Sequence, residues 1–171
     1  MTIAALGQLK PDKDIPEWLV SPPVAVPYFD GHELTFTLDT LSDDDSEAIE
    51  DAIRSFLSLG TEDRLAAGLH VFRNYQHMLE AVGSEDLTCS ITAVDEVWSH
   101  VHPTEVFVSK RGRRDDAIYI QITAECDWEI EHGLQIIYRG GSTLSRVSDQ
   151  DGHLTYTDAY DLPEEQDKID G

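Results

Sequence analysis

Residues 117–138 read AIYIQITAECDWEIEHGLQIIY, and this stretch decides the fold class. Apolar and polar residues alternate from Ala117 to Trp128, which is the pattern of a β-strand with one buried face. The apolar positions of this strand are Ile118, Ile120, Ile122, Ala124 and Cys126. A second apolar run follows at residues 134–138, after an acidic segment. Two such runs predict a β-hairpin that organises the sheet.

Further strands and two helices flank this hairpin. The other β-rich segments are residues 33–41, 104–108 and 144–147. Ser42 is expected to cap a first helix that ends at Gly60, and Thr61 to cap a second that ends at Gly83. The short join between them predicts an antiparallel helical pair. The expected fold class is α+β, a mainly antiparallel β-sheet packed against an antiparallel helical hairpin.

The two ends of the chain differ from its centre. Residues 1–30 hold five of the seven prolines. Proline fixes φ and removes an N–H donor, so this part is predicted to be an extended, Pro-rich arm. Residues 31–158 are expected to form a single α+β domain. Residues 159–171 are mostly acidic and polar, and we expect them to be a frayed acidic C-terminal tail.

The charge of the chain limits its partners. Asp and Glu number 34 against 12 Lys and Arg, for a formal net charge of -22. Such a chain repels phosphates and anionic lipids, so neither nucleic acid nor a membrane is an expected partner. No apolar run approaches the roughly 20 residues that cross a bilayer, and the N-terminus lacks a basic signal-peptide start. These features predict a cytoplasmic protein.

Acidic residues and histidines around the central hairpin are the candidate metal ligands. Glu125, Asp127, Glu129 and Glu131 stand at spacing two and would line one face of a continuous strand. Carboxylates and imidazoles together bind divalent metals. The candidate ligands are Glu129, Glu131, His132 and His153, with His100 and His102 as further candidates. The alternative interpretation is a hairpin loop with solvated acids, pinned to the core by Trp128 and Ile130.

A basic cluster marks a second hairpin. Four of the twelve basic residues fall within five positions, and they are Lys110, Arg111, Arg113 and Arg114. The glycine between them and the flanking strands predict a hairpin tip. This tip is a candidate contact for an acidic peptide, a phosphate or a partner. Against the acidic background of the chain, pairing with its own acids or with those of another subunit is the favoured interpretation.

No recognised catalytic motif is present. The sequence has no G-x-S-x-G, no P-loop, no G-x-G-x-x-G and no H-E-x-x-H. Cys126 falls on the apolar face of its strand, where burial raises the pKa of a thiol and makes it unreactive. The sequence therefore predicts no catalytic residue, and no cofactor other than a divalent metal.

The segment 127–134, DWEIEHGL, together with the strand before it, resembles an uncharacterised group of bacterial domains of unknown function. In that group a strand is followed by D-W-x-x-E-H-G-L and then by a second strand. The resemblance covers Val97 to Thr155 and includes Asp151-Gly152-His153-Leu154. It implies an α+β domain from a prokaryote, and it implies no activity and no catalytic residue.

Three hypotheses about function follow. The first is a non-catalytic protein-interaction domain, whose partner is a basic protein or a second copy in a homodimer. The second is a divalent-metal-binding protein or metal-dependent enzyme. The third and weaker one is an immunity-type protein that neutralises a toxin by charge complementarity.

Overall fold

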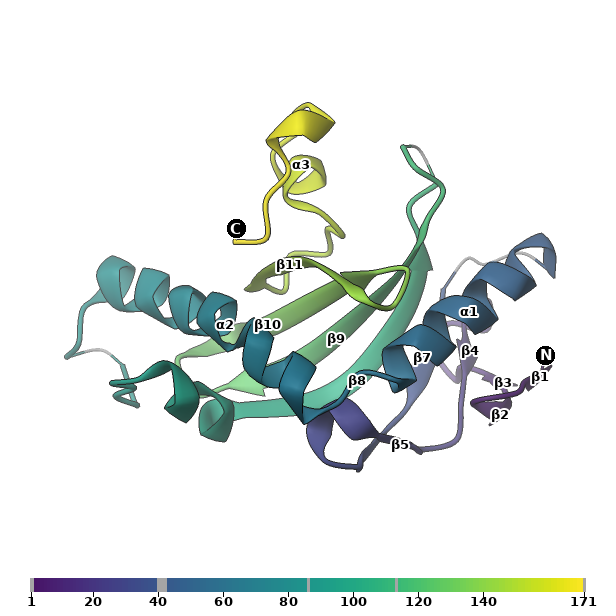
Figure 1. Cartoon of the computed structure of the whole chain (residues 1–171), viewed down its shortest axis with the longest axis horizontal. Coiled ribbons are helices and arrows are strands. Elements are labelled where there is room, and N and C mark those ends of the chain that lie inside the picture. The colour runs from purple at the N-terminus through teal and green to yellow at the C-terminus, as the bar shows by residue number, and fades with distance from the viewer. Residues whose placement is uncertain (1, 40–42, 86, 113, 171) are drawn as a thin grey trace.

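The computed structural model describes residues 2–39, 43–85, 87–112 and 114–170. Its centre is a seven-stranded sheet of order β11-β10-β9-β8-β7-β4-β3 (Figure 1). The strands of this sheet are β3 (Lys10–Pro11), β4 (Leu19–Val20), β7 (Phe36–Leu38), β8 (Val101–Lys110), β9 (Ile118–Cys126), β10 (Glu129–Arg139) and β11 (Thr143–Asp149). All neighbours pair antiparallel except β7 and β8, which are parallel.

The inner face of the sheet is the face that the alternating pattern predicts. Every apolar position of β9 is buried, from Ile118 to Cys126. The helices α1 (Ser46–Leu57) and α2 (Thr61–Val82) cover this face, α1 over β9 and α2 over β11. The short 3-10 helices η2 (Asp43–Asp45) and η3 (Val94–His100) precede α1 and β8, and η3 packs against α2. The α+β class with a mainly antiparallel sheet is thus confirmed.

The arrangement of the two long helices differs from a tightly packed hairpin. In Figure 1, α1 and α2 follow one another across the sheet and do not fold back side by side. Each helix has its own buried face, which for α1 includes Ile49 and Phe56 and for α2 includes Val71 and Tyr75. A wide sheet offers enough apolar surface for both, so neither helix needs the other for burial. Ser42, the expected cap of α1, lies outside the described residues.

The proline-rich arm packs on its own chain. Its short elements are β1 (Thr2–Ile3), β2 (Gly7–Gln8), β5 (Val24–Val26) and the 3-10 helix η1 (Pro27–Phe29), beside β3 and β4. Ile3, Leu6 and Tyr28 of this arm belong to the main hydrophobic core. The predicted strand from residue 33 is broken into β6 (His32–Leu34), which pairs with β5, and β7 of the main sheet.

The C-terminal residues are attached to the sheet, and the expectation that they fray is wrong. This part contains α3 (Tyr156–Ala159) and the 3-10 helix η4 (Glu164–Gln166). The N–H of Val147 in β11 donates to the carbonyl of Ile169 at 2.8 Å. The carboxylate of Asp170 pairs with His70 and Arg73 of α2. These ion pairs between segments far apart in sequence fix the end of the chain.

The outer face of the sheet is polar and only partly covered. Phe107, Gln121 and Thr123 alternate with the buried residues of β8 and β9, so they point to this side. Residues 151–153 lie against part of it, because Arg146 of β11 donates to Asp151 and to the carbonyl of His153, both at 2.8 Å. In the described parts of the chain, no helix is long and apolar enough to cross a membrane.

Candidate functional site

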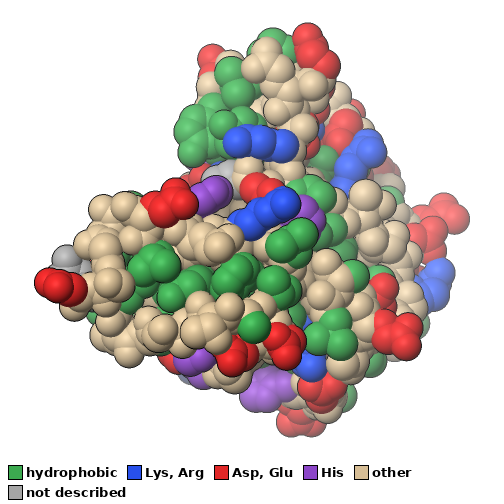
Figure 2. Space-filling model, turned by 60° about the vertical axis from the view of Figure 1, so that its left-hand side comes forward, with side chains coloured by type: hydrophobic (Ala, Val, Ile, Leu, Met, Phe, Trp, Pro, Cys, Tyr) green, Lys and Arg blue, Asp and Glu red, His purple; other side chains and the backbone are tan. Residues whose placement is uncertain are grey.

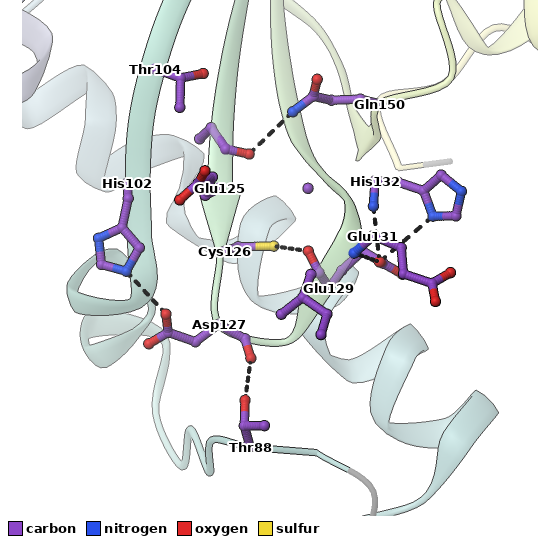
Figure 3. A pocket seen from close by; sticks show the side chains of 13 residues that line it. Thr88, His102, Thr104, Glu125, Cys126, Asp127, Glu129, Glu131, His132 and Gln150 are labelled. Atoms are coloured by element: carbon purple, nitrogen blue, oxygen red, sulfur yellow. Dashed lines mark hydrogen bonds and ion pairs between the residues drawn. The ribbon is translucent and has the colours of Figure 1, made fainter.

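The hairpin between β9 and β10 contains a wide bulge. Glu129 pairs with Cys126 across the turn Asp127-Trp128, and the next pair is Leu134 with Ala124. Four residues of β10, 130–133, therefore stand opposite a single residue of β9, Glu125. A bulge bends its strand and leaves the ladder open locally. A cleft of about 630 Å³ lies at this place, on the side where Glu125 and His102 project, with the helices behind the strands (Figure 3).

Gly133 and Gln150 hold the bulge in shape. Gly133 has a φ of +70°, and a Cβ there would lie 2.6 Å from the carbonyl oxygen of Ala124. The side-chain amide of Gln150 donates to the carbonyls of Ala124 and Leu134, at 3.2 and 3.3 Å. These donations supply hydrogen bonds where the interrupted ladder offers fewer. The close backbone approach and the positive φ therefore require a glycine at position 133.

Trp128 anchors the tip of the hairpin to α2. Its side chain is 3% exposed, and its indole N–H donates to the side-chain oxygen of Asn74 at 2.8 Å. The amide of Asn74 in turn donates to Asp149 at 2.9 Å. The hydroxyl of Thr88 donates to the carbonyl of Asp127 at 2.7 Å. These hydrogen bonds, two of them through Asn74, therefore hold the tip of the hairpin against α2 and β11.

The two histidines at spacing two converge on one carboxylate. His100 Nδ1 lies 2.8 Å from Oδ2 of Asp127, and His102 Nε2 lies 3.0 Å from its Oδ1. The hydrogen bond with His100, followed by that with His102, lowers the pKa of Asp127. Asp127 thus stays ionised. Its hydrogen bonds connect the hairpin turn to the end of η3, at His100, and to the start of β8, at His102.

The turn also separates the four carboxylates that would line one strand. Glu125 and Asp127 come before the tip, and Glu129 and Glu131 come after it, so the expectation of a single comb is wrong. Glu129 Oε1 accepts the backbone N–H groups of Glu131 and His132, at 2.8 and 3.1 Å. Its carboxylate is therefore engaged with the chain of the bulge itself.

The remaining candidate ligands are spread over this end of the sheet. His132 Nδ1 lies 3.6 Å from Glu129, whereas His153 lies 3.5 Å from Asp151, whose carboxylate binds Arg146. In residues 2–39, 43–85, 87–112 and 114–170, no group of three or more His, Cys, Asp and Glu is placed to hold a metal ion. Metal binding therefore stays a prediction from the sequence alone.

Ile130 is the unexpected residue of the site. The sequence suggests that it pins the hairpin to the core, but its side chain is 84% exposed. Of the two apolar residues, Trp128 is the one buried in the core, and Ile130 points outward from the bulge. Glu125 and Glu131 are also exposed, and within the described residues neither pairs with Lys, Arg or His. The cleft thus combines one apolar side chain with unneutralised carboxylates.

The basic hairpin tip between β8 and β9 is engaged with the chain's own acids. Arg111 is 6% exposed and donates to Asp158 and Glu164, at 2.7 and 2.8 Å. Arg114 also donates to Glu164, at 2.7 Å. Lys110 Nζ lies 2.8 Å from Asp45. Of the two kinds of pairing that the sequence favours, within the chain or between subunits, these contacts are within the chain; Arg113 lies outside the described residues.

Hydrogen bonds and burial shift the pKa of several groups near the two hairpins. The hydrogen bond from Arg111 lowers the pKa of both Asp158 and Glu164. Burial raises the pKa of the Cys126 thiol to about 12, and its Sγ lies 3.5 Å from the carbonyl of Glu129. The thiol therefore stays protonated and lies in the core, as its place in the alternating pattern predicts.

Sequence reasoning missed Asn74 and Gln150. Asn74 lies within a helical pattern and carries no local signal for its bond to Trp128. Gln150 follows a strand and looks like an ordinary loop residue. A polar residue among the apolar positions of α2 is the one available hint, because a buried amide needs a partner.

The fold and the cleft define an α+β domain with an open acidic site at one end of its sheet. Over residues 5–154 the chain matches the family described as Domain of unknown function (DUF6985), and it belongs to that family. The match begins far upstream of Val97, so it covers more than the resemblance implied. No curated protein and no solved structure is similar enough to count as a match.

Proposed function

We propose that this domain is a non-catalytic protein-interaction module whose hairpin cleft receives a cationic segment of a partner protein. The observation that carries the proposal is Ile130, 84% exposed on a hairpin that Trp128 and Asn74 hold firmly. A large apolar side chain on a rigid support loses little conformational freedom when a partner covers it. Covering such a side chain contributes about 1.5–3 kcal/mol.

The charges around Ile130 favour a cationic partner. Glu125 and Glu131 line the same cleft, and among the described residues neither has a Lys, Arg or His partner. A partner's Lys or Arg side chains would neutralise them at the rim while an apolar neighbour covers Ile130, the usual pattern of an apolar centre with a polar border. The net charge of -22 adds long-range attraction for a basic protein. The same charge opposes a homodimer through this cleft, because two acidic surfaces would meet.

The test is binding of a labelled peptide of repeated Lys-Leu-Ser units, measured by fluorescence anisotropy at low and high salt. Ile130→Ser and Glu131→Lys are expected to weaken binding about tenfold each, the loss that removal of a central contact typically causes. Glu33→Lys is the matched control, because it changes the charge equally at an exposed position of β6. The control is expected to bind like the wild type.

Two further peptides separate the contributions of charge and apolar contact. A Lys-Ser-Ser repeat keeps the charge and loses the leucine, and a Glu-Leu-Ser repeat reverses the charge. Both are expected to bind more weakly than Lys-Leu-Ser. Equal losses in Glu131→Lys and Glu33→Lys, with none in Ile130→Ser, would show that net charge alone attracts the peptide and would sink the proposal.

The metal-binding hypothesis is the alternative from the sequence, with Glu129 and His132 as its closest pair of candidate ligands. Elemental analysis of gently purified protein tests it directly. A basic toxin, as the immunity-type hypothesis requires, is one kind of cationic partner, so the peptide experiment bears on that hypothesis too.

A further inference from the structure

A second cleft, of about 480 Å³, lies further along the outer face of the sheet. Its floor is formed by β8 and β9 and one of its walls by the loop after β11, where Gln150 borders both clefts. The residues that decide its chemistry are Trp18, Asp39, Phe107 and Lys110. Its volume falls in the range of sites for small ligands or single side chains.

An aromatic corner forms one side of this cleft. The rings of Trp18 and Phe107 meet edge to face, with centroids 5.9 Å apart and planes at 81°. Phe107 points to the polar side of the sheet, whereas its neighbours Val106 and Val108 are fully buried on the inner side. Both rings are only partly buried. Partly exposed ring faces set at right angles are a favourable surface for an organic cation.

Asp39 supplies a carboxylate without a balancing charge. It follows β7, and its backbone N–H donates to the carbonyl of Val108 at 3.3 Å. Its Oδ1 is buried and has no hydrogen-bond partner among the described residues. Burial raises the pKa of this carboxyl and outweighs a hydrogen bond with Ser109 that lowers it, so the carboxylate has a hydroxyl partner but no positive charge beside it. A buried polar atom without a partner is uncommon in folded proteins, and it costs stability unless a ligand or ion compensates it.

The one cation that lines the cleft is already neutralised, as far as the described residues go. Lys110 Nζ lies 2.8 Å from Asp45 and 3.9 Å from Asp116. The hydrogen bond with Asp45 raises the pKa of Lys110 and holds its ammonium group. Lys110 therefore offers Asp39 little compensation, and the cleft keeps a negative character beside its aromatic corner.

We propose that this cleft binds an organic cation, an ammonium or guanidinium group, with the charge beside Asp39 and the stem against Trp18 and Phe107. This site is separate from the hairpin cleft and does not depend on the function proposed for it. The cation comes either from a free small amine or from a Lys or Arg side chain of a bound protein, and the chemistry of recognition is the same.

The test is calorimetric titration with butylguanidine, a free guanidinium compound of single charge, and with N-acetyl-arginine amide, which presents the same group on a backbone. N-acetyl-citrulline amide is the neutral control of nearly equal shape. We expect both cations to bind and the neutral compound to bind at least about tenfold more weakly. Tighter binding of butylguanidine points to a small free cation, and tighter binding of the arginine derivative to a protein side chain.

The variants Asp39→Asn and Trp18→Ala are expected to weaken binding of the cations about tenfold each. Asp39→Asn removes an uncompensated charge, so this variant is expected to unfold at a temperature equal to or above that of the wild type. Glu33→Gln, which removes one carboxylate charge at an exposed position of β6, is the matched control and is expected to leave cation binding unchanged. Equal binding of citrulline and arginine derivatives, or wild-type affinity in Asp39→Asn, would overturn the proposal.

Discussion

The strand β9 belongs to two hairpins that differ in how their tips are covered. We call the β8–β9 hairpin closed, because acids of the chain cover its tip, and the β9–β10 hairpin open, because its tip borders a cleft. At the β8–β9 end, Arg111 is buried and bound by Asp158 and Glu164. At the β9–β10 end, Glu125 and Glu131 project into solvent beside a cleft. Both tips are rich in charge, and among the described residues Arg111 is paired with carboxylates at the basic tip, whereas Glu125 and Glu131 at the acidic tip pair with no Lys, Arg or His.

The difference follows from the overall charge of the chain. Acidic residues outnumber basic ones by 34 to 12, so most acids cannot each have a Lys or Arg of their own, and acidic side chains are spread over the face that Figure 2 shows. A basic tip therefore finds acids nearby more readily than an acidic tip finds bases. In the function proposed above, the acidic tip is the one that an external partner would neutralise.

Replacing Arg111 in the closed hairpin should cause the largest loss of unfolding free energy. Arg111→Met keeps the apolar stem but leaves Asp158 and Glu164 without their partner. Loss of one member of a buried ion pair costs about 3 kcal/mol of unfolding free energy, and urea denaturation measures it. Arg114→Met, at a more exposed position, is the control and should cost much less. Equal losses for both variants would contradict the central role of Arg111.

Gly133→Ala should damage the open hairpin with a somewhat smaller effect. The new Cβ would meet the carbonyl of Ala124 at 2.6 Å, and the residue has a positive φ. Together these effects are expected to cost about 2 kcal/mol in urea denaturation. Gly152→Ala is the matched control, since Gly152 has a φ of +79° and nothing within 4 Å of an added Cβ. If Gly152→Ala costs as much, backbone strain alone explains the loss.

Acid should weaken the closed hairpin in particular. The pKa values of Asp158 and Glu164 are lowered in the folded state, chiefly by Arg111. Their stabilisation is therefore complete above the ordinary carboxyl pKa of about 4 and is lost as the pH falls through the lowered folded values. Unfolding free energies measured between pH 6 and the acid range should fall less steeply in Arg111→Met than in the wild type. Parallel curves would contradict this origin of acid sensitivity.

Ile130→Ser should change stability least of all. The side chain is almost fully exposed, so the unfolding free energy should shift by less than about 0.5 kcal/mol. The same urea experiment measures it, with Trp128→Phe as the contrasting variant, because that change leaves the buried oxygen of Asn74 without its donor. A large loss in Ile130→Ser would mean that Ile130 has a structural role.

The local patterns were the predictable part of this molecule. The alternation from Ala117 to Trp128 identified β9 and its buried face, because side chains of a strand point to opposite sides in turn. The same pattern placed Cys126 in the core. The sequence indicated that the acidic hairpin is a candidate site. It did not indicate the residues that support this hairpin, because Asn74 and Gln150 come from other segments and have no local signature.

The sequence by itself determined the α+β class, the burial of β9, the acidic charge and the expectation that the basic tip pairs with acids, either of its own chain or of another subunit. These depend on period, composition and charge, which are local or additive properties. Only the tertiary structure decided that His100 and His102 meet on Asp127, that Ile130 turns outward and that the C-terminal acids cover Arg111. Those outcomes depend on contacts between segments far apart in sequence, which the register of the strands and the bulge bring together.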